Sequence, residues 1–229
     1  MRTVFFIDGY NLYYGLLAST EYKWLDIPSL LAHIARVENP KSDSVSFQYF
    51  TAPVSPKLAT RGRQSKEAQD SYIRALKAKG VEVVFGRHRL DPAKAPRFVD
   101  KDTPPSRQDQ VAIWKLEEKE TDVNIALSMY RTAYKQMSFP EDERFQQMIL
   151  VSGDTDMGPA LRALREDFPD IRLGVILPHR ENVERGVPGS LDNHADWLRR
   201  QITLEELKSH QFPDRVPTRK KPAIKPEYW

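Results

Sequence analysis

The sequence predicts an α/β fold: a parallel sheet of about five strands with helices on both faces. Two observations lead to this prediction. Short apolar runs rich in β-branched and aromatic residues recur along the chain, and most are followed by a stretch with helical spacing. The chain also has 229 residues, 40% of them hydrophobic, which is enough for one core. Strands and helices that alternate in this way are typical of a parallel sheet covered on both sides.

The first predicted strand, residues 3–7, is a short apolar run that stops at Asp8-Gly9, where the chain turns. Residues 66–79 are predicted to be helical because their apolar side chains recur at helical spacing and Gly80 can end the helix. The other predicted helices are residues 11–17, 28–35, 121–134 and 159–165, and the other predicted strands are residues 45–50, 81–85, 148–151 and 173–177. Residues 195–202 fit either a strand or a short helix.

Two segments lack this periodicity. Residues 87–110 carry four prolines among charged side chains, so we expect an exposed loop or lid there. From Gln211 onward the composition shifts to Pro, Lys and Arg, which predicts a solvated tail. The expected organisation is one domain over residues 1–205, followed by a basic, Pro-rich C-terminal tail over residues 206–229.

Composition excludes several classes of protein. The absence of cysteine excludes disulfides, thiolate zinc sites, iron–sulfur clusters and a cysteine nucleophile. The motifs of dinucleotide oxidoreductases, P-loop NTPases and serine hydrolases are missing. A net charge of +3 and a pI near 9.0 are compatible with nucleic-acid binding without establishing it. No signal peptide or apolar run of membrane-spanning length is recognisable, so we expect a cytoplasmic protein with no membrane partner.

Two of the predicted strands end in acidic turns. One turn carries Asp8, and the other, in the run LVSGDTD, carries Asp154 and Asp156. In a parallel sheet these three carboxylates share one edge, near the point where strand order reverses. Clustered carboxylates raise one another's pKa unless a cation neutralises them, and hard oxygen ligands suit Mg²⁺ or Mn²⁺. Such an ion can activate water and stabilise a phosphate in transfer.

A purely local explanation of these residues stays open. Aspartate is common at strand ends and helix N-caps. Asp156 is followed by Gly158-Pro159 and so could cap the next helix, and Asp122 could be a favourable partner for a helix dipole.

Three stretches, FIDGYNL, EKETDVNIAL and LVSGDTDMGPAL, resemble the three motifs of the NYN domain in its LabA/DUF88-like branch, which belongs with the PIN-like nucleases. The resemblance covers roughly residues 2–177. It implies a Rossmann-like (PIN-like) sheet, an acidic cluster that binds Mg²⁺ or Mn²⁺, and hydrolysis of RNA phosphodiester bonds.

The resemblance also assigns site residues. Asp8 matches the acid of the first strand, Asn11 the polar residue that follows it, Asp122 the central acid, and Asp154 and Asp156 the late pair. The expected metal site is built from Asp8, Asp122, Asp154 and Asp156. Asp8, Asp154 and Asp122 are expected to hold the ion directly or through water, while Asn11 and Asp156 orient the attacking water or the ribose-phosphate.

One position departs from the family pattern. Ser128 stands where related sequences often carry a further acid, so a second metal ion is less expected than the first. The predicted function is a metal-dependent ribonuclease. One alternative is a catalytically weak nucleic-acid-binding or regulatory protein on the same fold. A remote alternative is a hydroxylase of pyridine compounds, an assignment made for some relatives, although the sequence shows no flavin or redox-metal site.

RNA is the expected partner, and self-association is left open. The candidate RNA-binding cations flank two predicted elements near the acidic edge: Arg61, Arg63, Lys66, Arg87 and Arg89. They fit ordinary solvated loops equally well. Tyr10, Tyr13 and Tyr14 could stack on bases, although helical spacing favours partial core packing for the last two.

Overall fold

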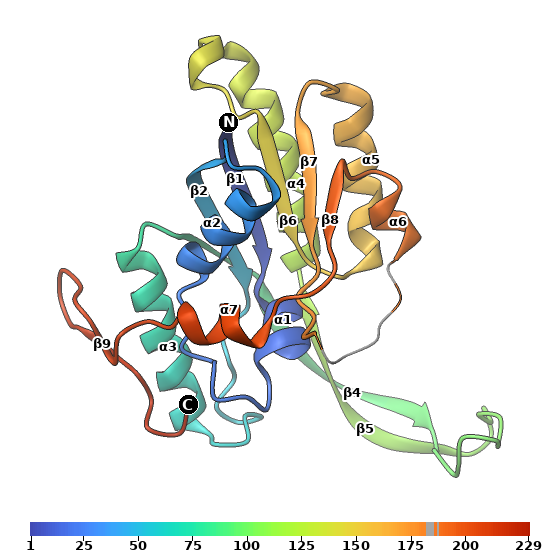
Figure 1. The fold of residues 1–229 in the computed structure, drawn as a ribbon. Coiled ribbons are helices and arrows are strands. Elements are labelled where there is room, and N and C mark those ends of the chain that lie inside the picture. Colours follow the sequence, from blue (N-terminus) through green and yellow to red (C-terminus); the bar gives the residue numbers. More distant parts are fainter. Residues whose placement is uncertain (182–185, 187) are drawn as a thin grey trace.

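The computed structural model describes residues 1–181, 186 and 188–229, and its centre is a six-stranded parallel sheet in the order β3-β2-β1-β6-β7-β8 (Figure 1). The strands are β1 Arg2–Asp8, β2 Asp43–Thr51, β3 Glu82–Phe85, β6 Gln147–Val151, β7 Arg172–Ile176 and β8 Trp197–Arg199. The predicted α/β fold is confirmed, with one strand more than expected. The extra strand is β8, which decides the open choice for residues 195–202, because it pairs in parallel with β7.

The order of the strands reverses beside β1. The chain runs from β1 through β2 to β3 on one side, then returns to the other side for β6, β7 and β8. The ends of β1 and β6 are therefore neighbours, with Ile7 paired to Val151. In open parallel sheets ligands bind in the crevice beyond such a reversal. This is the edge at which the acidic turns were predicted to meet.

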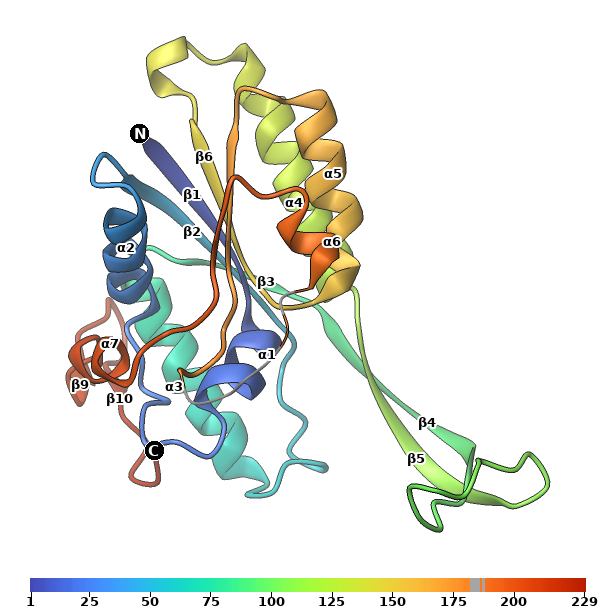
Figure 2. The same cartoon turned by 45° about the vertical axis from the view of Figure 1, so that its right-hand side comes forward.

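Helices cover both faces of the sheet (Figure 2). The first face carries α1 Gly9–Leu12, the π-helical turn η1 Tyr13–Leu17, α2 Ile27–Glu38, α3 Arg63–Ala78 and α7 Leu204–Ser209. The second face carries α4 Thr121–Lys135, α5 Gly158–Asp167 and α6 Gly189–Asp192. Strand β1 supplies both cores, since Phe5 and Ile7 pack on the first face and Val4 and Phe6 on the second. No helix among the described residues is long and apolar enough to cross a bilayer.

The C-terminal segment packs against the first face, so the prediction of a solvated tail is wrong. It contains a small hairpin of β9 Arg215–Val216 and β10 Ala223–Ile224. Phe212 is only 4% exposed, and the indole Nε1 of Trp24 donates a hydrogen bond of 2.8 Å to the Pro213 carbonyl. The Ser71 hydroxyl donates to the Ile224 carbonyl at 2.7 Å. Three apolar side chains of this Pro- and Lys-rich segment are buried in the first core, where α3 and Trp24 also lie: Phe212, Val216 and Ala223.

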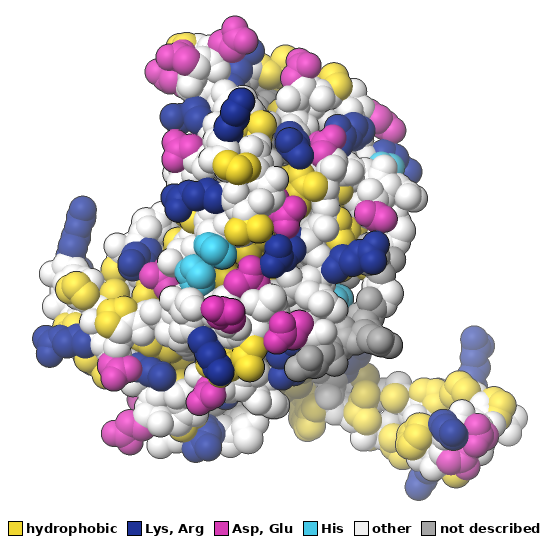
Figure 3. All heavy atoms as spheres, viewed as in Figure 1, with side chains coloured by type: hydrophobic (Ala, Val, Ile, Leu, Met, Phe, Trp, Pro, Cys, Tyr) yellow, Lys and Arg dark blue, Asp and Glu magenta, His cyan; other side chains and the backbone are white. Residues whose placement is uncertain are grey.

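The segment expected to be a loop forms an antiparallel hairpin, β4 Arg87–Pro96 and β5 Gln110–Lys119, which projects from the body as an arm (Figures 1 and 2). The prediction is therefore wrong for residues 87–96, which form a strand, whereas residues 97–109 are an exposed loop as expected. The two strands pair only with each other, so Pro92 and Pro96 can lie where no sheet hydrogen bond is needed. Apolar side chains gather on the arm in the space-filling view (Figure 3). The exposed apolar residues of its two strands include Leu90, Trp114 and Leu116.

Candidate active site

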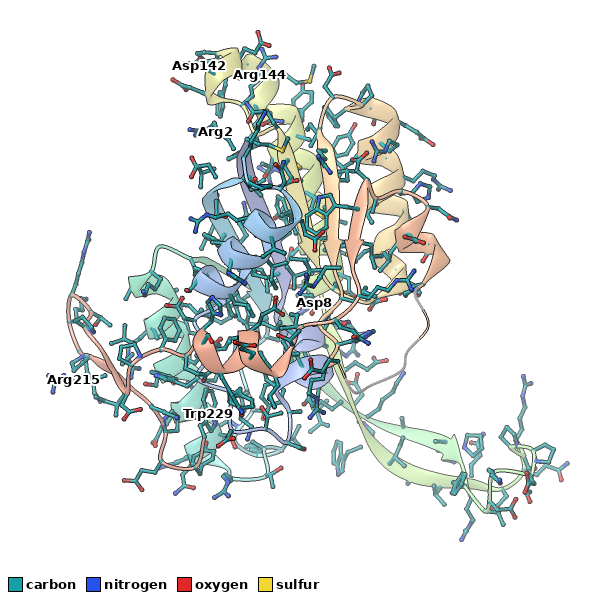
Figure 4. All side chains as sticks on the ribbon, in the orientation of Figure 1. Arg2, Asp8, Asp142, Arg144, Arg215 and Trp229 are labelled. Carbon is teal, nitrogen blue, oxygen red and sulfur yellow. The ribbon has the colours of Figure 1, made fainter. Side chains whose placement is uncertain are left out.

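Five carboxylates lie near one another beyond the ends of β1 and β6, and we call them the carboxylate cluster: Asp8, Glu118, Asp122, Asp154 and Asp156. Their mutual repulsion links them, because Asp8 is affected by Asp122 and Asp154, Asp122 by Asp154 and Asp156, and Glu118 by Asp8 and Asp122. The structure thus brings the four predicted aspartates into one region and adds Glu118. Figure 4 shows Asp8 at the end of β1 where this cluster lies.

Asp8 is the buried member of the cluster, at 3% exposure. Its Oδ1 accepts a hydrogen bond of 2.9 Å from the Asn11 backbone N–H, which caps α1, and its Oδ2 accepts one of 3.0 Å from the Ser152 hydroxyl. Burial raises the pKa of Asp8, the two hydrogen bonds oppose that rise, and the charges of Asp122 and Asp154 add to it. The carboxylate is therefore held in one orientation and its charge is destabilised.

Asn11 ties the two acidic turns together. Its side-chain Oδ1 accepts a hydrogen bond of 3.0 Å from the Gly153 backbone N–H. Ser152 completes the link, since its hydroxyl oxygen also accepts from the Asp154 backbone N–H at 3.1 Å. Asn11 and Ser152 are positioning residues that join the start of α1 to the turn after β6.

Of the two aspartates in the turn after β6, Asp154 caps a helical turn with its side chain and Asp156 does not. Oδ1 of Asp154 accepts a hydrogen bond of 2.9 Å from the Asp156 backbone N–H and so caps the 3₁₀ turn η4 Thr155–Met157. Helix α5 begins after Met157 without a side-chain cap, so the capping role considered for Asp156 is wrong. Among the described residues, no hydrogen bond reaches the carboxylates of Asp122 and Asp156, and both side chains are exposed. These two carboxylates face solvent, where a ligand can reach them.

Asp122 lies in the first turn of α4, where the helix dipole favours a negative charge. Desolvation by the surrounding protein nevertheless raises its pKa, and the charges of Asp154 and Asp156 raise it further. The negative charge of Asp122 is therefore favoured by the helix dipole and disfavoured by the charges of Asp154 and Asp156.

Glu118 is a site residue that sequence reasoning missed. It lies at the base of the arm, where the hairpin register pairs it with His88, and it accepts a hydrogen bond from the Thr121 hydroxyl. Desolvation raises the pKa of Glu118 to about 7, and the charges of Asp8 and Asp122 contribute to the rise. The available signal was its position four residues before Asp122, at the start of the stretch EKETDVNIAL, but residues 111–120 were assigned to no predicted element.

We expect the substitution Glu118→Gln to remove a pH-dependent loss of stability. Because folding raises the pKa of Glu118 from 4.5 to about 7, the folded state holds its proton more tightly than the unfolded chain does. Stability is therefore lost as the pH rises from about 4.5 to about 7, and the variant should show a flatter curve of melting temperature against pH in metal-free buffer.

Glu117→Gln is a matched control for this experiment. Hydrogen bonds from Lys115 and Lys119 lower the pKa of Glu117 from 4.5 to about 2, so its contribution is lost only toward acid pH. This control should keep the wild-type slope between about pH 4.5 and pH 7. Equal slopes for wild type and Glu118→Gln would contradict the raised pKa.

Two glycines allow the elements of the site to approach one another. A Cβ on Gly9 would lie 2.6 Å from both the Phe50 carbonyl oxygen and Cζ of Tyr49. A Cβ on Gly86 would lie 2.5 Å from the Thr121 hydroxyl oxygen. Neither glycine has a positive φ, so what each provides is space. Gly9 lets β1 end against β2, and Gly86 lets the arm begin against the first residue of α4.

Most of the cations predicted to bind RNA are engaged elsewhere. Three form ion pairs: Lys66 with Asp70 at 2.7 Å, Arg87 with Glu120 at 2.6 Å, and Arg89 with Asp91 at 2.6 Å. Arg63 is exposed at the start of α3. Arg61 differs from the others because its guanidinium lies 4.5 Å from the ring centre of Tyr228, beside a cavity. The structure therefore singles out Arg61 among the five.

That cavity, of about 540 Å³, adjoins the carboxylate cluster at Glu118. Its aromatic lining consists of Tyr10, Tyr13, Tyr14, Tyr49, Tyr72, His88, Tyr228 and Trp229. Tyr13 and Tyr14 are 36% and 66% exposed, so the expected partial packing in the core is not found. They belong to neither hydrophobic core and line the cavity instead.

The oxygen-only donor set of the cluster suits Mg²⁺ or Mn²⁺ by its chemistry. No three acidic or histidine side chains in the described part of the chain converge as ligands of one ion. Mg²⁺ is often held through one or two carboxylates while it keeps several waters, which is the mode that this arrangement permits. The raised pKa values of Asp8 and Asp122 agree with a site whose repulsion a cation would relieve.

Comparison with known proteins places this chain in a family. The NYN domain matches residues 2–196. The chain is 34% identical over 247 aligned positions to 6-hydroxy-3-succinoylpyridine 3-monooxygenase HspA of Pseudomonas putida (strain DSM 28022 / S16), covering 100% of this chain and 75% of that protein. A crystal structure of VPA0982, a protein of unknown function from Vibrio parahaemolyticus RIMD 2210633, is similar with a TM-score of 0.49 and 16% identity, over 92% of this chain and 96% of that one. The chain belongs to the NYN domain family, which shares the PIN-like nuclease fold.

Proposed function

We propose that this protein is a metal-dependent ribonuclease that hydrolyses RNA phosphodiester bonds at the carboxylate cluster. The observation that supports it most is the position of the cluster. Within an NYN domain, Asp8 and Asp154 follow neighbouring parallel strands at the reversal of strand order, and Asp122 repels both Asp154 and Asp8. Such a concentration of oxygen ligands is suited to a hard divalent cation.

In this proposal Asp8, Asp122 and Asp154 would hold Mg²⁺ or Mn²⁺, in part through water. When bound, the ion lowers the pKa of a coordinated water and neutralises charge on the phosphate. Asn11 and Ser152 keep Asp8 and the turn at Asp154 in place through their hydrogen bonds.

Two further carboxylates would act beside this set. Glu118 would accept a proton from the attacking water, because a pKa of about 7 suits a general base near neutral pH. The exposed Asp156 would orient that water or the ribose-phosphate. RNA is the proposed partner, and Arg61 is the cation best placed to meet its backbone near the cluster.

A cleavage assay tests this proposal. End-labelled single-stranded RNA, structured RNA and DNA of the same sequence are incubated with Mg²⁺, with Mn²⁺ and with a chelator. We expect cleavage of RNA in either metal, none in the chelator, and a higher melting temperature of the protein with the metals present. RNA binding without cleavage in any metal would reject the ribonuclease and favour a regulatory RNA-binding protein. Equal cleavage in the chelator would reject the role of the metal.

A second candidate function is hydroxylation of a pyridine ring. It is favoured by the identity of 34% to a pyridine monooxygenase across the whole chain and by the aromatic cavity beside the cluster. A monooxygenase inserts one atom of dioxygen into its substrate and reduces the other to water with two electrons from a donor. The proposal therefore includes dioxygen and a reduced nicotinamide, with added flavin, as co-reactants.

The two candidate reactions have different requirements. The protein is incubated with 6-hydroxy-3-succinoylpyridine, reduced nicotinamide, flavin and isotopically labelled dioxygen, and the products are analysed by mass spectrometry. Label in the product together with substrate-dependent oxidation of the nicotinamide would support the hydroxylase. Unchanged substrate alongside metal-dependent RNA cleavage would leave the ribonuclease.

A further inference from the structure

The cavity beside the carboxylate cluster has the features of a ligand-binding site. Neither the stability of the fold nor the carboxylate cluster requires these features. Its volume of about 540 Å³ lies within the usual range for small-molecule sites. Segments far apart in the sequence form its walls, since Tyr10 belongs to α1, Gln69 to α3, and Tyr228 follows β10. Figure 4 shows Trp229, another lining residue, on the side of the sheet where α3 and α7 lie.

Three tyrosines at one side of the cavity form a compact aromatic group. The ring centres of Tyr10 and Tyr14 are 5.8 Å apart, and those of Tyr13 and Tyr14 are 5.1 Å apart in an edge-to-face arrangement. Tyr14 is exposed although its ring lies close to the rings of Tyr10 and Tyr13. Exposed aromatic faces at a cavity are suited to stacking against a planar ring.

Hydrogen-bond acceptors lie at the end of the cavity next to the cluster. Nδ1 of His88 lies 2.9 Å from the Pro53 carbonyl, which can only accept, so Nδ1 carries the proton. With the proton on Nδ1, Nε2 is the acceptor for the Tyr10 hydroxyl. The Tyr10 oxygen and the Glu118 carboxylate are left to accept further hydrogen bonds, so this end is suited to a ligand with N–H groups.

Cationic side chains lie elsewhere in the lining. Arg61 and Lys23 both line the cavity, and neither forms an ion pair among the described residues. Arg61 lies over the Tyr228 ring, whose hydroxyl donates a hydrogen bond of 3.0 Å to the Gln64 carbonyl. The guanidinium is thereby oriented at the cavity, where it can pair with an anionic group.

We propose that this cavity binds a planar nitrogen heteroaromatic ring that carries an anionic group. The ring stacks against the group of Tyr10, Tyr13 and Tyr14, its N–H edge meets Glu118, and Arg61 pairs with the anion. Two sources have this chemistry: a nucleotide of an RNA strand, and a free heteroaromatic acid. The inference rests on the proposed function, since it identifies the part of the substrate that is held beside the cluster.

The test measures binding by isothermal titration calorimetry in a chelator, with both the wild type and Asp8→Asn, so that it does not depend on metal or catalysis. The two probes are guanosine 5′-monophosphate and 6-hydroxynicotinate. Ribose 5-phosphate, which lacks the ring, and benzoate, which lacks the ring nitrogen, serve as controls. We expect saturable binding of at least one probe, and about tenfold weaker binding of both controls.

Matched variants locate the binding site. Tyr14→Ala should weaken binding about tenfold, as expected for the loss of one stacking contact. The control Tyr134→Ala removes a tyrosine of similar exposure, 65% against 66%, near the far end of α4, and should have no effect. Arg61→Gln should weaken binding, whereas Arg131→Gln, on an exposed arginine of α4 outside the lining, should not.

The outcomes distinguish an RNA strand from a free small molecule as the source of the ligand. They also distinguish failure of this inference from failure of the proposed ribonuclease. Binding of the nucleotide alone identifies an RNA strand as the source, and binding of the pyridine alone identifies a free small molecule. Absence of saturable binding for both probes, or equal loss in Tyr14→Ala and Tyr134→Ala, would overturn the inference. Because the titration contains no metal, failure to bind either probe would reject this inference without deciding whether the protein cleaves RNA.

Discussion

Replacing Asp8 with asparagine is expected to abolish metal-dependent cleavage and, at the same time, to raise the melting temperature of the metal-free protein. The loss of activity should be at least about 100-fold, since even residues that only support a metal ligand cost about 10- to 100-fold when they are changed. The gain in stability follows from the raised pKa of Asp8, because folding then disfavours its charge at every pH above its usual value of 3.8.

The local structure around Asp8 should tolerate this change. Asparagine is as good an N-cap as aspartate, so its Oδ1 can keep the hydrogen bond from the Asn11 N–H. Its Nδ2 can donate to the Ser152 hydroxyl, which reverses the direction of the present hydrogen bond. The fold is therefore expected to persist while the negative charge is lost.

The measurements are RNA cleavage in Mn²⁺ and thermal unfolding in a chelator, with Asp142→Asn as the matched control. Asp142 is exposed at the opposite end of the sheet from Asp8, as Figure 4 shows, and its substitution should change neither quantity. Undiminished cleavage by Asp8→Asn would reject the proposed role of the cluster. A lower melting temperature would show that the charge of Asp8 stabilises the fold, contrary to its raised pKa.

The second large effect is expected at the C-terminal segment, where Phe212→Ala should lower the free energy of unfolding by about 3–5 kcal/mol. Phe212 is buried in the first core, and its ring centre lies 5.8 Å from that of Trp24 and 6.3 Å from that of Tyr72. Truncation would leave a cavity between these two rings. It would also loosen the neighbouring hydrogen bond from the Trp24 indole to the Pro213 carbonyl.

The free energies of unfolding of Phe212→Ala and of the control Phe98→Ala are measured by urea unfolding and compared with that of the wild type. Phe98 follows β4 at the tip of the arm and is 81% exposed, so its loss should change stability little. A destabilisation by Phe212→Ala no larger than that of Phe98→Ala would mean that residues 206–229 behave as the solvated tail that their composition predicts.

The sequence alone was sufficient for five of the six strands of the sheet and for the shared edge of Asp8 and Asp154. Apolar runs such as residues 3–7 are read from local periodicity, and the edge shared by Asp8 and Asp154 follows from the parallel arrangement. The arm could not be read in this way. Its strands pair only with each other and bury no face in a core. No buried face therefore imposes a periodic pattern of apolar residues on residues 87–110.

Tertiary structure decided everything that depends on contacts between distant segments. Glu118 joins the cluster because hairpin pairing and the packing of Gly86 against Thr121 bring the base of the arm to the end of β1. The cavity exists because the segment around Tyr228 returns across α3 to the tyrosines that follow β1. Composition and local spacing determined the sheet, its acidic edge and the absence of thiol chemistry, whereas pairing across long sequence separations determined which side chains complete the site.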